Sequence, residues 1–321
     1  MQNEPAITES LSPAPAHPWR GYLFIAAATF CWGAAVTFGK AIFNGSVFAG
    51  RTLISPIELT QARTTFTVLV LVPVLYFRFG GKIFRISKSD LLLCVLVGTL
   101  GVACSNYFYY LAVQKATVAL AITVQYTAPV WVLAYMVTRG RQKATPQRIS
   151  AAIMAIAGIT LAIGFFYSDA KISMIAVGAA LMASFGYAFY NVAAQGMITR
   201  NHQLTIMTYV LLSSALLWLI VNPPWRLAAQ HYSGTQWIFL FIFAVLSMLL
   251  PYIFYFSGLK YLDPTRAVIT SCLEPVFAIL FAAVFVHELL RPLQTVGIVA
   301  VLAATIVVQV SGKDSAPAAA A

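Results

Sequence analysis

Charged residues are scarce in this sequence. Only 9% of its 321 residues are Asp, Glu, Lys or Arg, and 60% are hydrophobic. A soluble domain carries roughly 25% charged residues, so this chain has too little charge to cover one core and stay dissolved in water. The composition excludes a soluble globular protein and indicates one that uses the lipid bilayer as its solvent.

Acidic groups are the scarcest of the charged residues, with 9 Asp and Glu against 20 Lys and Arg, which gives a net charge of +11. A basic chain could bind nucleic acid. Here the cations lie mostly in short connections between apolar runs, which is typical of membrane topology. We therefore expect no nucleic-acid partner.

The motifs of enzymes and metal proteins are missing as well. The four cysteines (Cys31, Cys94, Cys104 and Cys272) lie in apolar runs, form no CxxC pair and have no histidines clustered near them. Neither GxSxG, HExxH nor a Walker motif occurs. We expect no metal, no cofactor, no catalytic residues and no direct coupling to ATP.

A cationic leader is also lacking, because residues 1–18 contain no Lys or Arg. A secretory signal needs such a leader. Residues 1–18 and 312–321 are rich in Pro, Ala and Ser and are predicted to be disordered tails, the first of them followed by a retained helix.

Long apolar runs, in contrast, are abundant, and each is about the 20 residues that a helix needs to cross a membrane. The sequence predicts an all-α integral membrane protein with ten transmembrane helices, at 21–42, 57–77, 90–112, 116–138, 148–167, 173–196, 205–222, 235–258, 265–287 and 292–310. Cations are concentrated in alternate connections, chiefly 78–88 and 139–148. By the positive-inside rule, both termini are cytoplasmic.

An internal repeat divides these ten helices. Residues 107–131 align without a gap over 253–277, an offset of 146, and Pro129 then meets Pro275. The predicted repeats are 19–168 and 169–311. Because five is odd, two five-helix copies in one chain must be inverted relative to each other. Inverted repeats are typical of alternating-access transporters, whose substrate site lies near the bilayer midplane.

The runs "FCWGAAVTFGK" (30–40), "PIELTQARTTFTVLVLVP" (56–73), "ATVALAITVQYTAPVWVLAY" (116–135) and "DPTRAVITSCLEPVFAILFAAVFVHELLRPLQTVGIVAVLAATIVV" (263–308) resemble the drug/metabolite transporter superfamily, specifically its EamA-type ten-helix carriers. The first repeat departs at its last turn, where "RGRQKA" replaces the usual glutamate. The resemblance implies a bacterial inner-membrane protein with a central cavity between its halves, which often exports amino acids or related metabolites.

Glu274 is the sharpest candidate residue. A charged acid near the centre of a membrane helix is costly and should face protein or water. It could carry a proton or balance a cationic substrate group, or it could be a purely structural buried carboxyl. Pro275 follows Glu274, and the repeat aligns Pro275 with Pro129. Each proline frees the carbonyl four residues back, at Ser271 and Gln125. Such interruptions favour a binding and gating role, although an ordinary kink would look the same.

Further polar and aromatic side chains fall on helix faces that must meet a cavity or another helix. One predicted helix carries a polar stripe of Tyr187, Asn191 and Gln195, spaced four residues apart, with Tyr190 alongside. Hydrogen bonding between helices alone would also explain this stripe. The predicted substrate-binding residues are Trp32, Asn106, Tyr109, Gln125, Tyr187, Tyr190, Asn191, Tyr252, Tyr255, Ser271 and Glu274. Arg63 is expected to pair with Glu58 or with backbone carbonyls, a structural role being favoured over substrate contact. Lys40 is expected to reach the outer surface rather than a substrate carboxylate.

The expected function is therefore secondary transport, and more specifically export, of small organic metabolites such as amino acids. The expected partners are that substrate and membrane lipid, with a coupled proton and a homodimer left open. A multidrug or lipophilic-cation efflux carrier is the main alternative, and a membrane scaffold without transport is a weaker one.

Overall fold

The computed structural model describes residues 18–43, 54–115, 118–162, 173–285 and 291–310. Within these ranges every element is helical, which confirms the all-α prediction. The two predicted tails lie outside the described residues, apart from Pro18, which begins α1.

The described residues of the first half form nine helical segments, two of which are not α-helical: η1 is a 3-10 turn and η2 a π-helix. They are α1 (Pro18–Phe43), α2 (Pro56–Phe79), η1 (Gly81–Phe84), α3 (Lys88–Leu96), η2 (Val97–Ala103), α4 (Cys104–Lys115), α5 (Val118–Gln125), α6 (Ala128–Thr138) and α7 (Pro146–Ala162). In the second half η4 is again a π-helix. Its segments are α8 (Met174–Ile198), α9 (Gln203–Val221), α10 (Pro224–Ala228), α11 (Gly234–Ala244), η4 (Val245–Leu249), α12 (Leu250–Leu259), α13 (Pro264–Ser271), α14 (Leu273–Phe285) and α15 (Pro292–Val310).

The 146-residue offset read from the sequence also relates the helix boundaries. Both π-helices fall at the same place, since η2 ends at Ala103 and η4 at Leu249. In the same register α5 ends at Gln125 and α13 at Ser271, and α7 and α15 both begin at a proline, Pro146 and Pro292. The two halves therefore share local helix geometry as well as weak sequence similarity.

Six of the described helical stretches are long and apolar enough to cross a membrane: Pro56–Phe79, Lys88–Lys115, Leu120–Thr138, Met174–Ile198, Gln203–Val221 and Gly234–Leu259. Two shorter apolar helices, Pro146–Ala162 and Pro292–Val308, add to them. The chain is thus a multi-pass membrane protein, and the count of ten spans stays a prediction.

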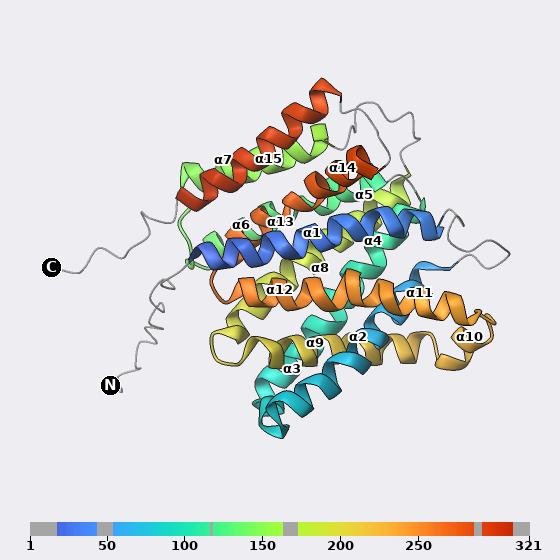
Figure 1. The fold of residues 1–321 in the computed structure, drawn as a ribbon. Coiled ribbons are helices and arrows are strands. Elements are labelled where there is room, and N and C mark those ends of the chain that lie inside the picture. Colours follow the sequence, from blue (N-terminus) through green and yellow to red (C-terminus); the bar gives the residue numbers. More distant parts are fainter. Residues whose placement is uncertain (1–17, 44–53, 116–117, 163–172, 286–290, 311–321) are drawn as a thin grey trace, which may run out of the picture.

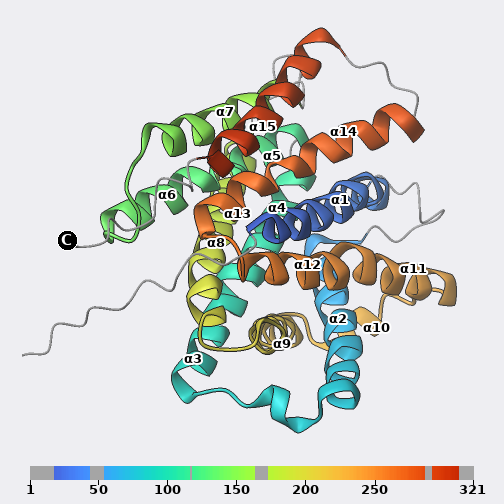
Figure 2. The same ribbon diagram turned by 60° about the vertical axis from the view of Figure 1, so that its left-hand side comes forward.

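In Figure 1, α1, α9 and α12 run across the view, and α2 and the α3–α4 stretch cross them at a steep angle. In both views α7 and α15 lie side by side at one edge, α2, α3 and α9 occupy the opposite edge, and α1 and α12 lie between them (Figures 1 and 2). Glycines allow the closest helix contact: a Cβ added to Gly297 would lie 2.3 Å from the backbone nitrogen of Ala162. Such small residues are what membrane helix interfaces favour.

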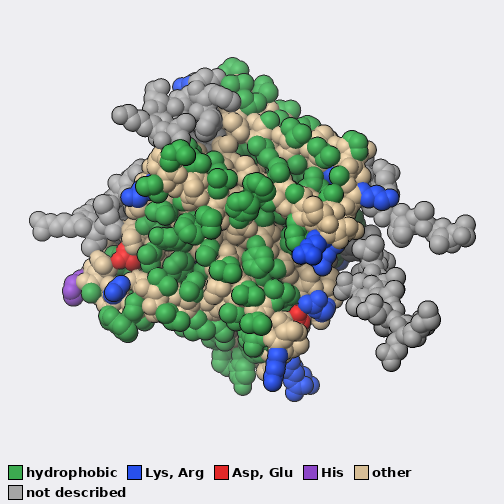
Figure 3. All heavy atoms as spheres, turned by 180° about the vertical axis from the view of Figure 1, so that it is seen from behind, with side chains coloured by type: hydrophobic (Ala, Val, Ile, Leu, Met, Phe, Trp, Pro, Cys, Tyr) green, Lys and Arg blue, Asp and Glu red, His purple; other side chains and the backbone are tan. Residues whose placement is uncertain are grey.

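The outer surface is apolar. Figure 3 shows a broad hydrophobic face with Lys and Arg side chains near its margins. Large side chains in the middle of helices, among them Leu69, Ile153 and Ile306, are more than half exposed. In water such a surface would drive aggregation, whereas in a bilayer it contacts lipid.

Polar residues at the helix starts satisfy the first backbone N–H groups, as helix ends require. Ser55 forms a capping box with Glu58 at the start of α2, and Ser233 forms one with Gln236 at the start of α11. At the other end of α2, Gly80 adopts φ +68°, which ends the helix and favours glycine.

Candidate functional site

Two broken helices lie at corresponding places in the two repeats. The α5–α6 stretch is interrupted between Gln125 and Ala128, and the α13–α14 stretch between Ser271 and Leu273. Pro129 and Pro275 follow these breaks directly, as the sequence predicted. Because neither proline has an N–H, the carbonyls of Gln125 and Ser271 lose their usual helical partners.

Tyr126 and Glu274 join the two breaks. The Tyr126 hydroxyl donates to a Glu274 carboxylate oxygen at 2.7 Å. Tyr126 is buried and Glu274 is half-buried. On the other side of α14, Gly33 of α1 lies so close that an added Cβ would be 2.9 Å from the carbonyl oxygen of Glu274. Glu274 therefore lies where α14 of the second repeat meets α1 and the α5–α6 break of the first repeat.

Arg63 of α2 is a second charged group inside the protein, with only 4% of its surface exposed. Its Nε donates to the Ser247 hydroxyl at 2.8 Å and its Nη2 to the Ser247 carbonyl at 2.7 Å. Its Nη1 donates to the Tyr110 hydroxyl and, at 3.4 Å, to Asn106. The rings of Tyr110 and Phe243 lie 5.1 and 5.5 Å from the guanidinium carbon. The expected pairing with a backbone carbonyl is confirmed, whereas Glu58 instead accepts from the Ser55 N–H and from Tyr232.

Asn106 and Tyr252 connect Arg63 to an aromatic cluster. The Asn106 amide donates to the Tyr252 hydroxyl at 3.1 Å across a separation of 146 residues, so that these repeat mates contact each other. The Tyr252 ring is stacked with Tyr190 at 6.4 Å and meets Trp32 edge-on at 5.8 Å. The interface between the repeats therefore passes between Asn106 and Tyr252.

Two members of the predicted stripe on α8, Tyr187 and Asn191, lie in a closed hydrogen-bond chain. Tyr187 donates to Ser271 at 2.8 Å and lies 3.1 Å from the Tyr255 hydroxyl. Tyr255 donates to the Asn191 side-chain oxygen at 2.6 Å, and the Asn191 amide donates back to the Tyr187 carbonyl at 2.7 Å. All four side chains are buried. This chain satisfies costly polar groups in an apolar setting and joins α8 to α12 and α13.

The eleven predicted substrate-binding side chains thus separate by exposure. The half-buried ones are Trp32, Asn106, Tyr109, Gln125 and Glu274, and the buried ones are Tyr187, Tyr190, Asn191, Tyr252, Tyr255 and Ser271. In this conformation the first set is the more accessible of the two. Contact with a substrate stays a prediction for both. The side chain of Lys40 lies outside the described residues.

Three participants were absent from the predicted site: Tyr110, Tyr126 and Ser247. Each has a signal in the sequence. Tyr126 directly precedes the α5–α6 interruption, and Ser247 is the only hydroxyl in the apolar run 238–251. A lone hydroxyl in such a run needs a partner, but the sequence does not say that the partner is Arg63.

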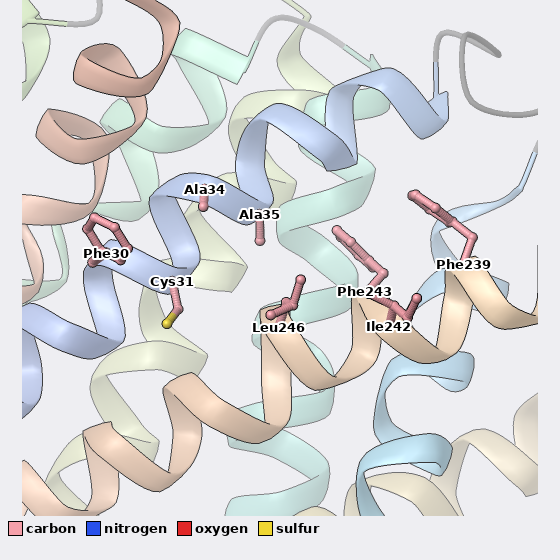
Figure 4. Close-up of a pocket in the computed structure, with 8 residues that line it drawn as sticks. All are labelled: Phe30, Cys31, Ala34, Ala35, Phe239, Ile242, Phe243 and Leu246. Carbon is pink, nitrogen blue, oxygen red and sulfur yellow. The ribbon is translucent and has the colours of Figure 1, made fainter. Parts of the chain in front are cut away.

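An apolar pocket of about 210 Å³ adjoins this cluster between α1 and α11–η4. Its lining side chains approach one another from the two helices (Figure 4). They are Phe30, Cys31, Ala34, Ala35, Phe239, Ile242, Phe243 and Leu246. Phe243 also lies against Arg63, so this ring contacts both the pocket and the buried cation.

No group of three or more His, Cys, Asp or Glu side chains able to hold a metal ion occurs in the described part of the chain.

Comparison with known proteins places this arrangement among transporters. The model of the EamA-like transporter family matches residues 19–164 and again 174–310. The uncharacterized inner membrane transporter YicL of Salmonella typhimurium is 23% identical over 305 residues, covering 94% of this chain and 98% of that protein. The uncharacterized transporter YxxF of Bacillus subtilis is 27% identical over 199 residues, 61% and 63% of the two chains.

A solved crystal structure has the same fold, with a TM-score of 0.71 at 18% identity, covering 91% of this chain and 97% of the other.

Proposed function

Since this chain belongs to the EamA-like transporter family, we propose that it exports small organic metabolites such as amino acids across the inner membrane by alternating access. The hydrogen bond between Tyr126 and Glu274 is the observation that carries this proposal. It places an acid at the meeting of two broken helices, and broken helices surround the substrate sites of many transporters.

The repeat supports the alternating mechanism. In each half a π-helix, a broken helix and a proline-initiated last helix recur in the same register. With five spans in each half, the copies are inverted, so that each can adopt the conformation of the other. Exchanging the two conformations opens the interface first to one side of the membrane and then to the other.

An amino acid suits the charges at this interface. Glu274 offers a carboxylate to an ammonium group, and Asn106 and Gln125 offer amide groups to polar atoms. The aromatic cluster favours the second candidate, a lipophilic cation. The ring centroid of Trp32 lies 5.8 Å from that of Tyr252 and 5.3 Å from that of Tyr255. Such rings bind cations through their faces.

Glu274 is also the proposed coupling group. Acids inside membrane proteins commonly relay protons, and this one has a hydroxyl donor beside it. Protonation would release its hold on a cationic substrate group. Exchange of a proton for the substrate then drives export against the substrate gradient.

Reconstitution into vesicles tests the proposal. Uptake of amino acids, nucleosides and cationic drugs would be measured with and without a proton gradient. The wild-type protein is expected to carry an amino acid and to respond to the gradient. Glu274→Gln, which keeps the shape of the side chain, is expected to lose about tenfold in gradient-driven rate. Tyr126→Phe removes only the hydroxyl and should lower this rate less.

Tyr135→Phe is the matched control, since Tyr135 is exposed on α6 and should transport as the wild type does. Wild-type rates for Glu274→Ala under both conditions would remove Glu274 from the mechanism. Preferential transport of cationic drugs would favour the second candidate.

A further inference from the structure

Arg63 carries a buried charge without a direct ion-pair partner among the residues that the structure describes. Among the described residues, the arginines in ion pairs are Arg148, Arg200 and Arg266, and Arg63 is not one of them. Its hydrogen-bond partners, Ser247, Tyr110 and Asn106, are all neutral. They satisfy its N–H groups but place no counter-charge in direct contact with it.

An uncompensated buried cation is costly, and the rings of Tyr110 and Phe243 offset only part of that cost. A residue needed solely to link α2 to η4 could do so without charge, since a glutamine amide also donates to a hydroxyl and a carbonyl. The retained charge therefore points to an anionic group that is not part of this chain.

The surroundings of Arg63 indicate where that group would enter. Asn106 is half-buried, and its 3.4 Å contact is the longest hydrogen bond that Arg63 makes. A rotation of the Asn106 side chain would open Nη1 to a ligand. Glu274 lies within electrostatic range of Arg63, so the two supply opposite charges at one interface.

We propose that Arg63 is the anion-binding pole of the substrate site and receives a carboxylate group of the substrate, in place of the Asn106 amide oxygen. This inference rests on the proposed carrier function and makes it specific: a substrate must contain a carboxylate. Guanidinium N–H groups form strong charge-assisted hydrogen bonds to carboxylates, and the Nη1 N–H group is the one that Asn106 would vacate. Arg63 then links α2 to η4 through Ser247 and also selects substrates that contain a carboxylate.

Two variants of one residue test this inference. Asn106→Asp places a carboxylate of the same shape beside Arg63, and Asn106→Leu removes the amide without adding charge. Asn106→Asp is expected to raise the melting temperature of the purified, ligand-free protein above that of Asn106→Leu, because an internal ion pair replaces the missing anion. A lower melting temperature for Asn106→Asp than for Asn106→Leu would overturn the inference, because the cation would then already be compensated.

Ligand binding gives an independent readout. The thermal shift of the wild-type protein would be measured with each amino acid and with its amide, which has the same body without the carboxylate. We expect amino acids to bind at least tenfold more tightly than their amides, Asn106→Leu to keep this preference and Asn106→Asp to lose it. Equal binding of acid and amide, no binding of any amino acid, or an unchanged preference in Asn106→Asp would overturn the inference.

Vesicle transport separates this outcome from failure of the carrier function. Transport of amides or cationic drugs at the same rate as amino acids would leave the carrier standing and refute the role of Arg63. Carboxylate-selective thermal shifts without transport of any tested solute would support the anion site and refute the carrier.

Discussion

Gly33 is where a single missing side chain sets the position of Glu274. A Cβ at this site would lie 2.8 Å from Cβ of Phe277, 2.9 Å from the nitrogen of Ala278 and 2.9 Å from the carbonyl oxygen of Glu274. Two of these three atoms are backbone, which cannot turn aside as a side chain can. The close contact of α1 and α14 therefore depends on glycine.

We predict that Gly33→Ala lowers the free energy of unfolding by about 1–3 kcal/mol, as overpacking usually does, and slows transport by moving Glu274. Thermal melting in detergent and vesicle uptake would measure the two effects. Gly178→Ala is the control: it lies on α8 with no atom within 4 Å of an added Cβ, so it should be neutral. Equal melting temperatures for the two variants would show that α1 and α14 can move apart without loss of stability.

At the same scale, the sequence could identify costly residues but not their partners. Glu274, Asn191 and Tyr255 stand out because polar groups are rare in apolar runs. That Tyr126 reaches Glu274, or that Asn191 is satisfied by Tyr187 and Tyr255, depends on how separate helices cross. Periodicity along one helix contains no information about those crossings.

At the scale of elements, the ends of helices were more predictable than their interiors. Proline fixed the breaks before Pro129 and Pro275, because it removes a backbone donor wherever it lies. The two π-helical segments, Val97–Ala103 and Val245–Leu249, have no comparable signal. The extra residue in a π-helical turn is stabilised by contacts with other helices. In the second repeat, Arg63 makes this contact by donating hydrogen bonds to the hydroxyl and the carbonyl of Ser247. π-segments are frequent at functional sites, which agrees with the place of this one.

Asp263 links two elements of different repeats at the α13 N-terminus. Its side chain lies 3.3 Å from Arg266 Nε and 3.8 Å from the buried Arg148 of α7, and Thr265 donates to Gln142 nearby at 2.8 Å. Asp263 also caps α13 by accepting from the Arg266 N–H at 3.0 Å.

We predict that Asp263→Asn keeps the cap, because Asn caps as well as Asp, but destabilises the protein by about 1–3 kcal/mol by leaving the buried Arg148 without its counter-charge. Hydrogen exchange should increase at the start of α7 and of α13 and stay unchanged at α2. A melting temperature equal to that of the wild type would mean that this ion pair contributes nothing to joining the repeats.

At the scale of the whole molecule, composition and the long apolar runs predicted the class and the all-helical fold, and the resemblance of four runs to known carriers predicted the family. The number of membrane spans was harder to predict, because α7 and α15 are short and the α5–α6 and α13–α14 stretches are broken. Orientation depends on charges in the connections. The α2–α3 connection and α10 lie at opposite ends of α9, since Thr205 at its start donates to the Ile83 carbonyl and α10 follows its last residues.

We predict that the α2–α3 connection is cytoplasmic and the α10 region external, because cations favour the cytoplasmic side. In a background without the four native cysteines, a membrane-impermeant maleimide should label Ala229→Cys in intact cells and Lys82→Cys only after the cells are opened. Both positions are exposed, so each can react. The reverse pattern would invert the topology.

The contact between Asn106 and Tyr252 joins the same position of both copies. When the two repeats exchange conformations, Asn106 takes the position of Tyr252 and Tyr252 takes that of Asn106. The pair therefore lies on the axis that relates the two repeats. A substitution at this pair should perturb the outward-open and inward-open forms to a similar extent. It would change how fast the carrier cycles while leaving the balance between its two faces nearly untouched.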